Sequence, residues 1–351
     1  MMTTDPSSRN RILWADLCRI TATLGVILIH VSAPVFYDRQ APLDSFLAAN
    51  LFDSLSRVSV PLFVMLSGSL LLKGSPSLRS VLRRVIKVTL PLLFWSLVYS
   101  CWNNRAAWRT TEGFIGAVGS MLSGPVISHL WFVYMIVGLY ILLPILSVVA
   151  GALERNRTTA VYLFTLWLAV NVLPVYVRIP LFKHLILSGF FNWAGFFLLG
   201  GWLDSAFSSG VFRPPSRGTL LFIYLLASTV TFFLAWHVNP PGSVPDETPY
   251  SYFSPNVVAA SVAAFLCLRQ TAPPPVLAGL LRYLSERMYA VYLMHLLTIE
   301  LLTYAMKIHP ILPRPVPPLL GIPALAVATA LVSLGVASVL RLVPKSETLT
   351  G

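Results

Sequence analysis

The sequence predicts an all-α, polytopic membrane protein with about ten transmembrane helices. Three observations support this prediction: the composition, the lengths of the apolar runs and the distribution of positive charge. Apolar residues make up 56% of the 351-residue chain and charged residues only 11%, whereas soluble domains carry about 25% charged residues. The mean hydropathy is +0.75. We therefore expect a single membrane domain over residues 1–351, without a sizeable soluble domain.

Ten apolar runs have the length of about 17–25 residues that a helix needs to span a bilayer. They cover residues 12–36, 45–72, 85–102, 129–150, 158–176, 186–206, 218–236, 255–270, 286–305 and 317–342. The first run is too long for the core of a signal peptide and lacks a small-residue cleavage site, so we expect it to remain as the first span. The eighth run is short and the sixth contains a glycine pair, which leaves nine or eleven spans as alternatives.

The positively charged residues predict the orientation of this ten-helix bundle, which occupies residues 12–342. If the N-terminus is cytoplasmic, sixteen of the 25 Lys and Arg residues fall on cytoplasmic segments, seven on outer segments and two within spans. Cytoplasmic loops are enriched in Lys and Arg, so the tails at 1–11 and 343–351 are both predicted to be cytoplasmic. The same bias explains the net charge of +12 without a nucleic-acid partner.

The first span carries two ionisable residues, which are costly inside a membrane and usually face a cavity or a partner. Arg19 and His30 are eleven residues apart, or three helical turns plus about 20°, so they share one face about 16 Å apart along the axis. Asp16 precedes Arg19 by one turn and is expected to pair with it. Taken singly, Arg19 could be a snorkelling interfacial residue and His30 a helix-packing residue. The shared face favours a functional pair.

Arg57 lies midway through the second predicted span, where insertion scales assign an arginine a cost of about 2.5–3.5 kcal/mol. We expect it either to form a structural ion pair or to contact a substrate. Pro61 and Gly68 in the same span permit a bend or the close approach of another helix.

The cytoplasmic segment that follows, 73–87, holds five positive charges, including Arg83 and Arg84. One interpretation is that these charges set the topology and contact anionic headgroups. The other is a site for a phosphorylated cytoplasmic ligand, because arginine forms bidentate hydrogen bonds with phosphate.

The later spans add ionisable and aromatic residues toward the outer surface. His129 opens the fourth span beside Trp131 and Tyr134, whose rings form either an interfacial aromatic belt or a platform for a sugar. His295 and Glu300 lie five residues apart in the ninth span and therefore not on one strict helix face. The three cysteines have neither metal nor disulfide spacing, and no nucleotide-phosphate or hydrolase motif is present. We therefore expect no metal, and place any catalysis on the intramembrane His and Arg residues.

Four blocks of this sequence resemble the integral-membrane acyltransferase family 3, in the branch that acetylates surface polysaccharides. RITATLGVILIH, residues 19–30, is similar to the family's first-helix pattern of an arginine, ten residues and a histidine. SRVSVPLFVMLSGSLLLK resembles its second-helix block, HLWFVYMIVGLYILLPIL its fourth-helix block, and SERMYAVYLMH a late aromatic block that ends in histidine. The order and spacing agree over nearly the whole chain, as in a stand-alone member.

The resemblance implies an O-acyltransferase, expected to transfer acetyl, in a bacterial inner membrane and without a permanently bound cofactor. The implied donor is cytoplasmic acetyl-CoA or another acyl-CoA, and the implied acceptor is a hydroxyl of a cell-envelope polysaccharide or lipid-linked glycan. His30 and Arg19 are the expected catalytic residues, with His30 as general base or acyl carrier. The donor is expected to bind Arg19, Arg57, Arg83 and Arg84.

The acceptor is expected to contact five residues of the later spans. They are His129, Trp131, Tyr134, His295 and Glu300. The alternative function is a transporter or exporter of a small or lipid-linked substrate, since ten helices with buried charges suit transport as well. A third possibility is a non-catalytic partner of a polysaccharide synthase. The sequence predicts no particular oligomeric state.

Overall fold

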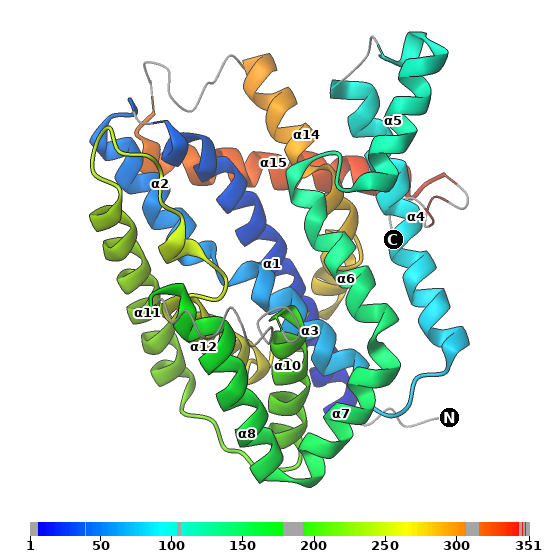
Figure 1. Cartoon of the computed structure of the whole chain (residues 1–351), viewed down its shortest axis with the longest axis vertical. Helices are drawn as coiled ribbons and strands as arrows, with labels where there is room; N and C mark the ends of the chain where they lie inside the picture. The colour runs from blue at the N-terminus through cyan, green and yellow to red at the C-terminus, as the bar shows by residue number, and fades with distance from the viewer. Residues whose placement is uncertain are drawn as a thin grey trace.

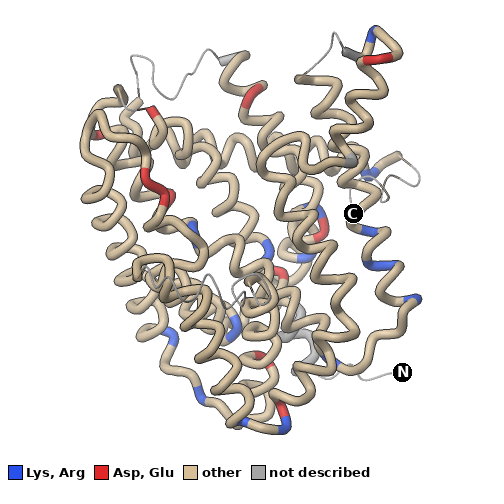
Figure 2. The backbone as a smooth tube through the Cα atoms, viewed as in Figure 1, with Lys and Arg blue, Asp and Glu red and all other residues tan. Residues whose placement is uncertain are grey.

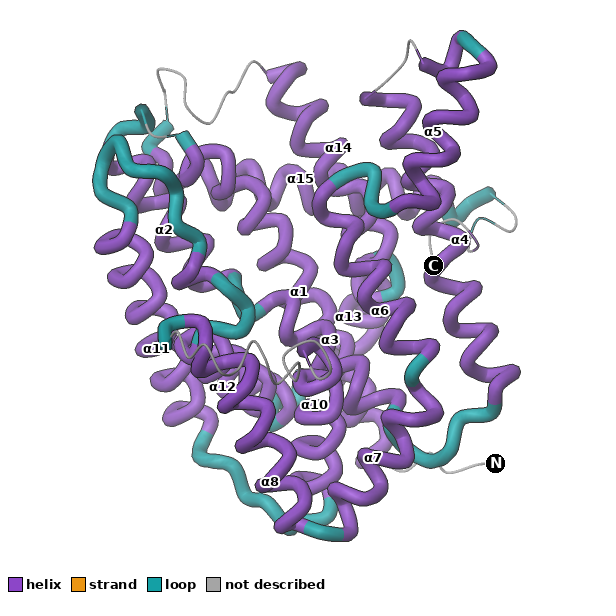
Figure 3. The backbone as a smooth tube through the Cα atoms, viewed as in Figure 1, coloured by secondary structure: helices purple, strands orange, loops and turns teal. Residues whose placement is uncertain are grey.

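The computed structural model of the chain describes residues 6–38, 40–103, 107–177, 192–306 and 316–343, with 346 and 348. Over these ranges the chain is helical and contains no β-strand, as Figure 3 shows. All ten predicted spans coincide with helices where they are described. The beginning of the sixth span, 186–191, lies outside the described residues, as does most of the C-terminal tail.

The described α-helices vary from 8 residues in α13 to 32 residues in α1, or from about two to about nine turns. Their bounds are α1 Pro6–Tyr37, α2 Leu43–Ser56, α3 Ser59–Leu71, α4 Leu78–Asn103, α5 Thr111–Ser123, α6 Trp131–Ile141, α7 Leu143–Arg155, α8 Arg157–Trp167, α10 Asn192–Ser208, α11 Arg217–Val238, α12 Pro255–Arg269, α13 Ala278–Ser285, α14 Met288–Met306 and α15 Pro318–Leu340. Short 3-10 turns include η2 Ser128–Leu130 and η5 Thr248–Tyr250, and a π-helical turn, Leu168–Val172, follows α8. α1 begins six residues before the predicted first span.

Among the described residues, seven helical segments are long and apolar enough to cross a membrane, or eight if the bent pair of α6 and α7 is one span. The two helices of this pair meet at 69°. Pro144 stands in the first turn of α7, where it lacks an N–H and its ring clashes with the carbonyl four residues earlier. α10 and α14 fall below the length or hydropathy of a full span, although both match predicted spans.

The second predicted span is interrupted at Arg57, between α2 and α3. Pro61 accounts for the break, because its ring clashes with the carbonyl of residue 57 and it donates no hydrogen bond. Further along α3, Gly68 packs directly on α10: a Cβ atom at Gly68 would lie 1.8 Å from the carbonyl oxygen of Phe197. The expected close helix approach is present at Gly68, and α2 and α3 together form one candidate span, Leu43–Leu71.

α1 occupies the centre of the bundle, where it contacts α2, α3, α12, α13, α14 and α15 (Figure 1). It is one continuous helix, so the eleven residues from Arg19 to His30 cover about 16 Å along its axis. Both side chains therefore lie within the helical bundle on one face of α1, as predicted.

The basic residues lie mainly toward one end of the bundle. Figure 2 shows them along the first half of α4 and in the loops that join α7 to α8 and α10 to α11. This is the distribution expected if that end faces the cytoplasm. We call it the inner end, and the orientation itself stays a prediction.

Candidate active site

Three histidines from three separate segments lie together inside the bundle. His30 comes from α1, His129 from the turn η2 before α6, and His295 from α14. The ring centroids of His30 and His295 are 5.1 Å apart, those of His129 and His295 are 4.8 Å apart, and those of His30 and His129 are 6.2 Å apart. The fold thus joins three of the predicted site residues into one histidine cluster.

Backbone carbonyls orient two of these rings. His295 Nδ1 lies 2.5 Å from the carbonyl oxygen of Tyr292, and His129 Nε2 lies 3.3 Å from that of Leu293. A carbonyl only accepts hydrogen bonds, so each of these ring nitrogens is the donor. In the neutral rings, His129 Nδ1 and His295 Nε2 are therefore acceptors, and within the described chain both are buried without a partner.

Two tyrosine hydroxyls donate hydrogen bonds to backbone carbonyls at the histidine cluster. The hydroxyl of Tyr292 donates to the carbonyl of His129 at 2.5 Å, and the hydroxyl of Tyr99 donates to the carbonyl of Leu293 at 2.9 Å. The Tyr292 ring lies 5.6 Å, centroid to centroid, from both His129 and His295. These hydrogen bonds join α4 and the turn η2 to α14 around the cluster.

His30 differs from the other two histidines in its accessibility. The exposed fraction of the side chain is 2% for His129 and 0% for His295, whereas His30 is half-buried. Within the described chain, no hydrogen bond occupies the His30 ring. The His30 side chain is therefore the most exposed of the three, and the rings of His129 and His295 pack beside it.

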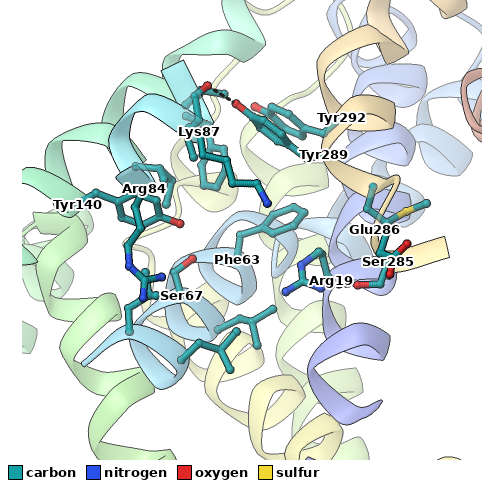
Figure 4. A pocket seen from close by; sticks show the side chains of 18 of the residues that line it. Arg19, Phe63, Ser67, Arg84, Lys87, Tyr140, Ser285, Glu286, Tyr289 and Tyr292 are labelled. Carbon is teal, nitrogen blue, oxygen red and sulfur yellow. Dashed lines mark hydrogen bonds between the residues drawn. The ribbon is translucent and has the colours of Figure 1, made fainter. Parts of the chain in front are cut away.

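A basic cavity of about 820 Å³ opens on the inner side of this cluster. Four of its lining residues are cationic: Arg19 of α1, Arg84 and Lys87 of α4, and Arg341 after α15. Glu286 is the one acidic residue among the described lining residues. Figure 4 shows Arg19 and Arg84 on opposite sides of the cavity and Lys87 reaching between them. Such a set of cations suits an anionic ligand, above all one with several phosphates.

Arg19 is held in this cavity by two neighbours. Its Nη1 lies 3.1 Å from Asp16 Oδ1 and also donates to the hydroxyl of Ser285. Ser285 Oγ in turn donates to Asp16 Oδ1 at 2.7 Å. The predicted pairing of Asp16 with Arg19 is confirmed, and Ser285, from the end of α13, completes a closed triangle of hydrogen bonds.

Three aromatic rings that contact one another line the cavity. We call them the aromatic collar: Phe63 of α3, Phe132 of α6 and Tyr292 of α14, all of which line the cavity. Their centroids are 5.5–6.2 Å apart. None of the three histidines belongs to the described cavity lining, but the collar residue Tyr292 lies 5.6 Å, centroid to centroid, from both His129 and His295.

Arg57 lies outside the basic cavity. Its Nη2 is 2.6 Å from Asp53 Oδ2, one turn earlier, and its guanidinium lies 4.5 Å above the Tyr250 ring. Asp53 is completely buried. The first of the two expected roles of Arg57, a structural ion pair, is therefore present. Arg83 and Arg84 are both exposed on α4, and of the two only Arg84 belongs to the described cavity lining.

The remaining predicted residues occupy different surroundings. Tyr134 donates its hydroxyl to the carbonyls of Met121 and Gly124, at 3.0 and 3.2 Å, and so anchors the end of α5. Glu300 accepts a 2.8 Å hydrogen bond from the indole of Trp102, near the outer end of α14. Neither has a recorded contact with the histidine cluster within the described chain.

Trp131, two residues after His129, belongs to a second aromatic group. Its ring centroid lies 5.4 Å from that of Trp193 and 6.2 Å from that of Tyr252, and Trp193 and Tyr252 are 5.4 Å apart. All three rings are half-buried. We call them the outer aromatic group.

Sequence reasoning missed several lining residues. Lys87 could have been predicted as a neighbour of Arg84 in the site, because it follows Arg84 by three residues and so shares its helix face. Arg341 and Ser285 gave no such signal, since only the packing of α15 and α13 brings them to the cavity. Among the described residues, no group of three or more His, Cys, Asp or Glu is arranged to hold a metal ion.

Searches of curated proteins and of solved structures found no match to this chain. A family model described as an acyltransferase domain matches residues 12–338. The match covers nearly the whole chain and includes the histidine cluster, the collar and all but one of the cationic cavity residues. By this match, the chain belongs to acyltransferase family 3 and is a multi-pass membrane acyltransferase.

Proposed function

We propose that the protein is an O-acetyltransferase of a bacterial inner membrane. It takes acetyl from acetyl-CoA on the cytoplasmic side and transfers it to a hydroxyl of an envelope polysaccharide or lipid-linked glycan. One observation carries this proposal: a single face of α1 leads from Arg19 in the basic cavity to His30 in the histidine cluster. That path connects a site for an anionic ligand with a reactive ring.

The cavity suits coenzyme A in charge and shape. Coenzyme A has several phosphates at one end and a long, thin thiol arm at the other. Arg19, Arg84, Lys87 and Arg341 would bind the phosphates, because charge-assisted contacts to phosphate are among the strongest hydrogen bonds. The arm would extend along α1 over about 16 Å toward the aromatic collar. Arg57 and Arg83 do not belong to the described cavity lining. Of the four arginines expected to bind the donor, the cavity therefore supports Arg19 and Arg84.

His30 is the group that we expect to act on the acceptor. As a general base, it takes the proton of the acceptor hydroxyl while the oxygen attacks the thioester carbonyl. A carbon–oxygen bond forms, the carbon–sulfur bond breaks, and the proton passes to the departing thiolate. Alternatively, His30 first accepts the acetyl group and then yields it to the hydroxyl. His129 and His295 pack beside the His30 ring in either route.

On the acceptor side, the outer aromatic group offers flat surfaces on which sugar rings could stack. Its rings are half-buried rather than enclosed, and Trp131 follows His129 by two residues. A sugar held there would lie next to the histidine cluster. This position supports a glycan as acceptor.

The test is acetyl transfer by His30→Ala in membranes supplied with radiolabelled acetyl-CoA. We expect transfer to glycan to fall at least about 100-fold, because positioned acid–base groups contribute 10²–10⁴-fold. The matched control is His237→Ala, which removes an exposed histidine at the end of α11. Glycan mass spectrometry would identify the acetylated hydroxyl.

Two outcomes would reject the proposal. Normal transfer by His30→Ala, at wild-type protein levels, would exclude the proposed chemistry. Label that never reaches a glycan in the wild type, together with substrate flux into vesicles, would favour the transporter instead.

A further inference from the structure

We propose that Arg57 is a positioning residue for the acceptor, because it holds the loop that carries Tyr252 of the outer aromatic group. This loop, residues 239–254, joins α11 to α12 and contains the turn η5. The inference rests on the proposed function, in which a sugar stacks on the outer aromatic group. It gives Arg57 a task on the acceptor side in place of the expected contact with the donor.

Arg57 is a buried cation with a fixed orientation. Its Nη2 lies 2.6 Å from Oδ2 of the completely buried Asp53. Such a pair contributes little net stability, since the cost of removing both charges from water offsets their attraction. What the pair does supply is a guanidinium whose plane and position are set before any substrate binds.

This guanidinium contacts the loop through its tyrosines. The Arg57 Cζ atom lies 4.5 Å from the centroid of the buried Tyr250 ring, within the range of a cation–π interaction. The positive charge also acts on Tyr252, two residues further along the loop and half-buried. One cation of the second predicted span therefore engages both tyrosines of the loop.

Tyr250 is the point at which the loop is fastened to the helices. Its hydroxyl donates to Oδ1 of Asn50 on α2 at 2.5 Å, and Asn50 donates in turn to the carbonyl of Phe232 on α11 at 2.9 Å. The Tyr250 ring also lies 5.1 Å, centroid to centroid, from Phe36 of α1. Arg57 thus completes a set of contacts from three helices to one loop residue.

The rest of the loop is braced by its own hydrogen bonds. Asn239 accepts from the backbone N–H of Asp246 at 2.7 Å and donates to its carbonyl at 3.0 Å. Near the other end, Ser254 Oγ donates to the carbonyl of Thr248 at 2.6 Å. The loop is therefore folded without a substrate, and Tyr252 is presented to Trp131 and Trp193 in advance.

A preformed platform binds its ligand more tightly than one that must first be ordered, because ordering side chains and loops costs binding free energy. Loss of the Arg57 contacts would transfer that cost to the step in which the sugar binds. The basic cavity has other lining residues and would keep its affinity for the donor. The inference therefore predicts a change in acceptor affinity alone.

The experiment uses Arg57→Lys, which keeps a positive charge beside Asp53 but loses the planar group that stacks on aromatic rings. Glycan extracted from cells that lack the protein is titrated into membranes with radiolabelled acetyl-CoA. We expect the KM for this glycan to rise about tenfold, as for the loss of a desolvated cation–π contact. The KM for acetyl-CoA and kcat should each stay within about twofold of wild type. Tyr252→Ala should give the same division, and Tyr252→Phe, which keeps the ring, a smaller rise.

Arg269→Lys is the matched control. Arg269 also pairs with a completely buried aspartate, Asp204, and its guanidinium also lies over aromatic rings, those of Trp14 and Phe207. The substitution therefore removes the same kind of contact at the inner end of the bundle. It should leave the KM for the glycan unchanged.

Two further measurements keep the inference testable if Arg57→Lys accumulates poorly. The double variant Asp53→Asn with Arg57→Gln removes both charges and leaves no buried charge without a partner; it should raise the KM for the glycan as well. In the detergent-solubilised protein, amide hydrogen exchange over residues 246–254 should be faster in the double variant than in wild type. Exchange at the wild-type rate would show that the pair does not hold the loop.

The kinetic outcomes separate the inference from the proposed function. If the wild type transfers acetyl but neither Arg57 variant raises the KM for the glycan, Arg57 does not position the acceptor site. A rise in the KM for acetyl-CoA instead would return Arg57 to the donor, and a fall in kcat alone would place it at the reacting atoms. An equal effect of Arg269→Lys would also overturn the inference. If the wild type transfers no acetyl to the glycan, the proposed function itself is wrong.

Discussion

At the scale of single residues, the guanidinium of Arg19 is oriented by Asp16 and Ser285. The carboxylate and the hydroxyl hold it from one side and leave its other nitrogen atoms directed to the cavity. The hydroxyl also donates to the carboxylate, so removing it loosens both partners. Ser285 is therefore a positioning residue for the proposed donor site, and Arg19 is the group that touches the donor.

Ser285→Ala should raise the KM for acetyl-CoA by about tenfold and change kcat little. The reason is that a hydrogen bond to a charged group contributes about 1.5–3 kcal/mol. Here the bond from Arg19 to Ser285 orients the guanidinium before the donor binds. Ser285→Thr, which keeps the hydroxyl, should restore most of the affinity. Ser209→Ala is the control, since that exposed hydroxyl bonds only backbone carbonyls of α10. A fall in kcat at constant KM would contradict the positioning role.

At the scale of elements, the inner ends of three helices are joined by one buried carboxylate. Asp204 of α10 lies 2.7 Å from Lys73, which follows α3, and 2.5 Å from Nε of Arg269 at the end of α12. The Arg269 guanidinium also packs over the Trp14 ring of α1 at 5.0 Å. Asp204 is completely buried, so its charge depends on these partners.

Asp204→Ala should destabilise the protein by about 3–5 kcal/mol, because it leaves the half-buried guanidinium of Arg269 without its carboxylate partner and also removes the ion pair of the exposed Lys73. Thermal unfolding of the detergent-solubilised protein would measure the effect as a lowered Tm. Glu154→Ala, at an exposed position near the end of α7, should stay within about 0.5 kcal/mol of wild type. Equal stability of both variants would show that the network is dispensable.

The elements also explain how far the sequence could predict the site. Apolar runs locate helices, and an ionisable residue within such a run is conspicuous, so Arg19, His30, His129 and His295 could be selected individually. Their meeting depends on how α1, η2 and α14 pack, which no local pattern encodes. The collar could not be predicted for another reason. Phenylalanine and tyrosine are ordinary residues in apolar helices, and these three rings meet only through the packing of α3, α6 and α14.

At the scale of the whole molecule, the proposed reaction needs substrates that arrive from opposite sides. The basic cavity contains Arg19, one face of α1 connects Arg19 to His30, and the outer aromatic group includes Trp131, two residues after His129. Because α1 carries a cavity residue and the reactive histidine on one face, the two substrates would meet within the membrane. This arrangement works only if the inner end faces the cytoplasm, where acetyl-CoA is made available.

Cysteine labelling tests that orientation in a variant whose three native cysteines are replaced by serine. Ser75→Cys lies in the exposed segment between α3 and α4, and Val244→Cys lies in the loop before η5, where the valine is 86% exposed. With cytoplasmic termini, a membrane-impermeant maleimide should label Val244→Cys in intact spheroplasts, but Ser75→Cys only after permeabilisation. The positive-inside distribution of Lys and Arg is the physical reason. The reverse pattern would place the basic cavity outside the cell, away from any coenzyme A thioester, and the proposed direction of transfer would then be impossible.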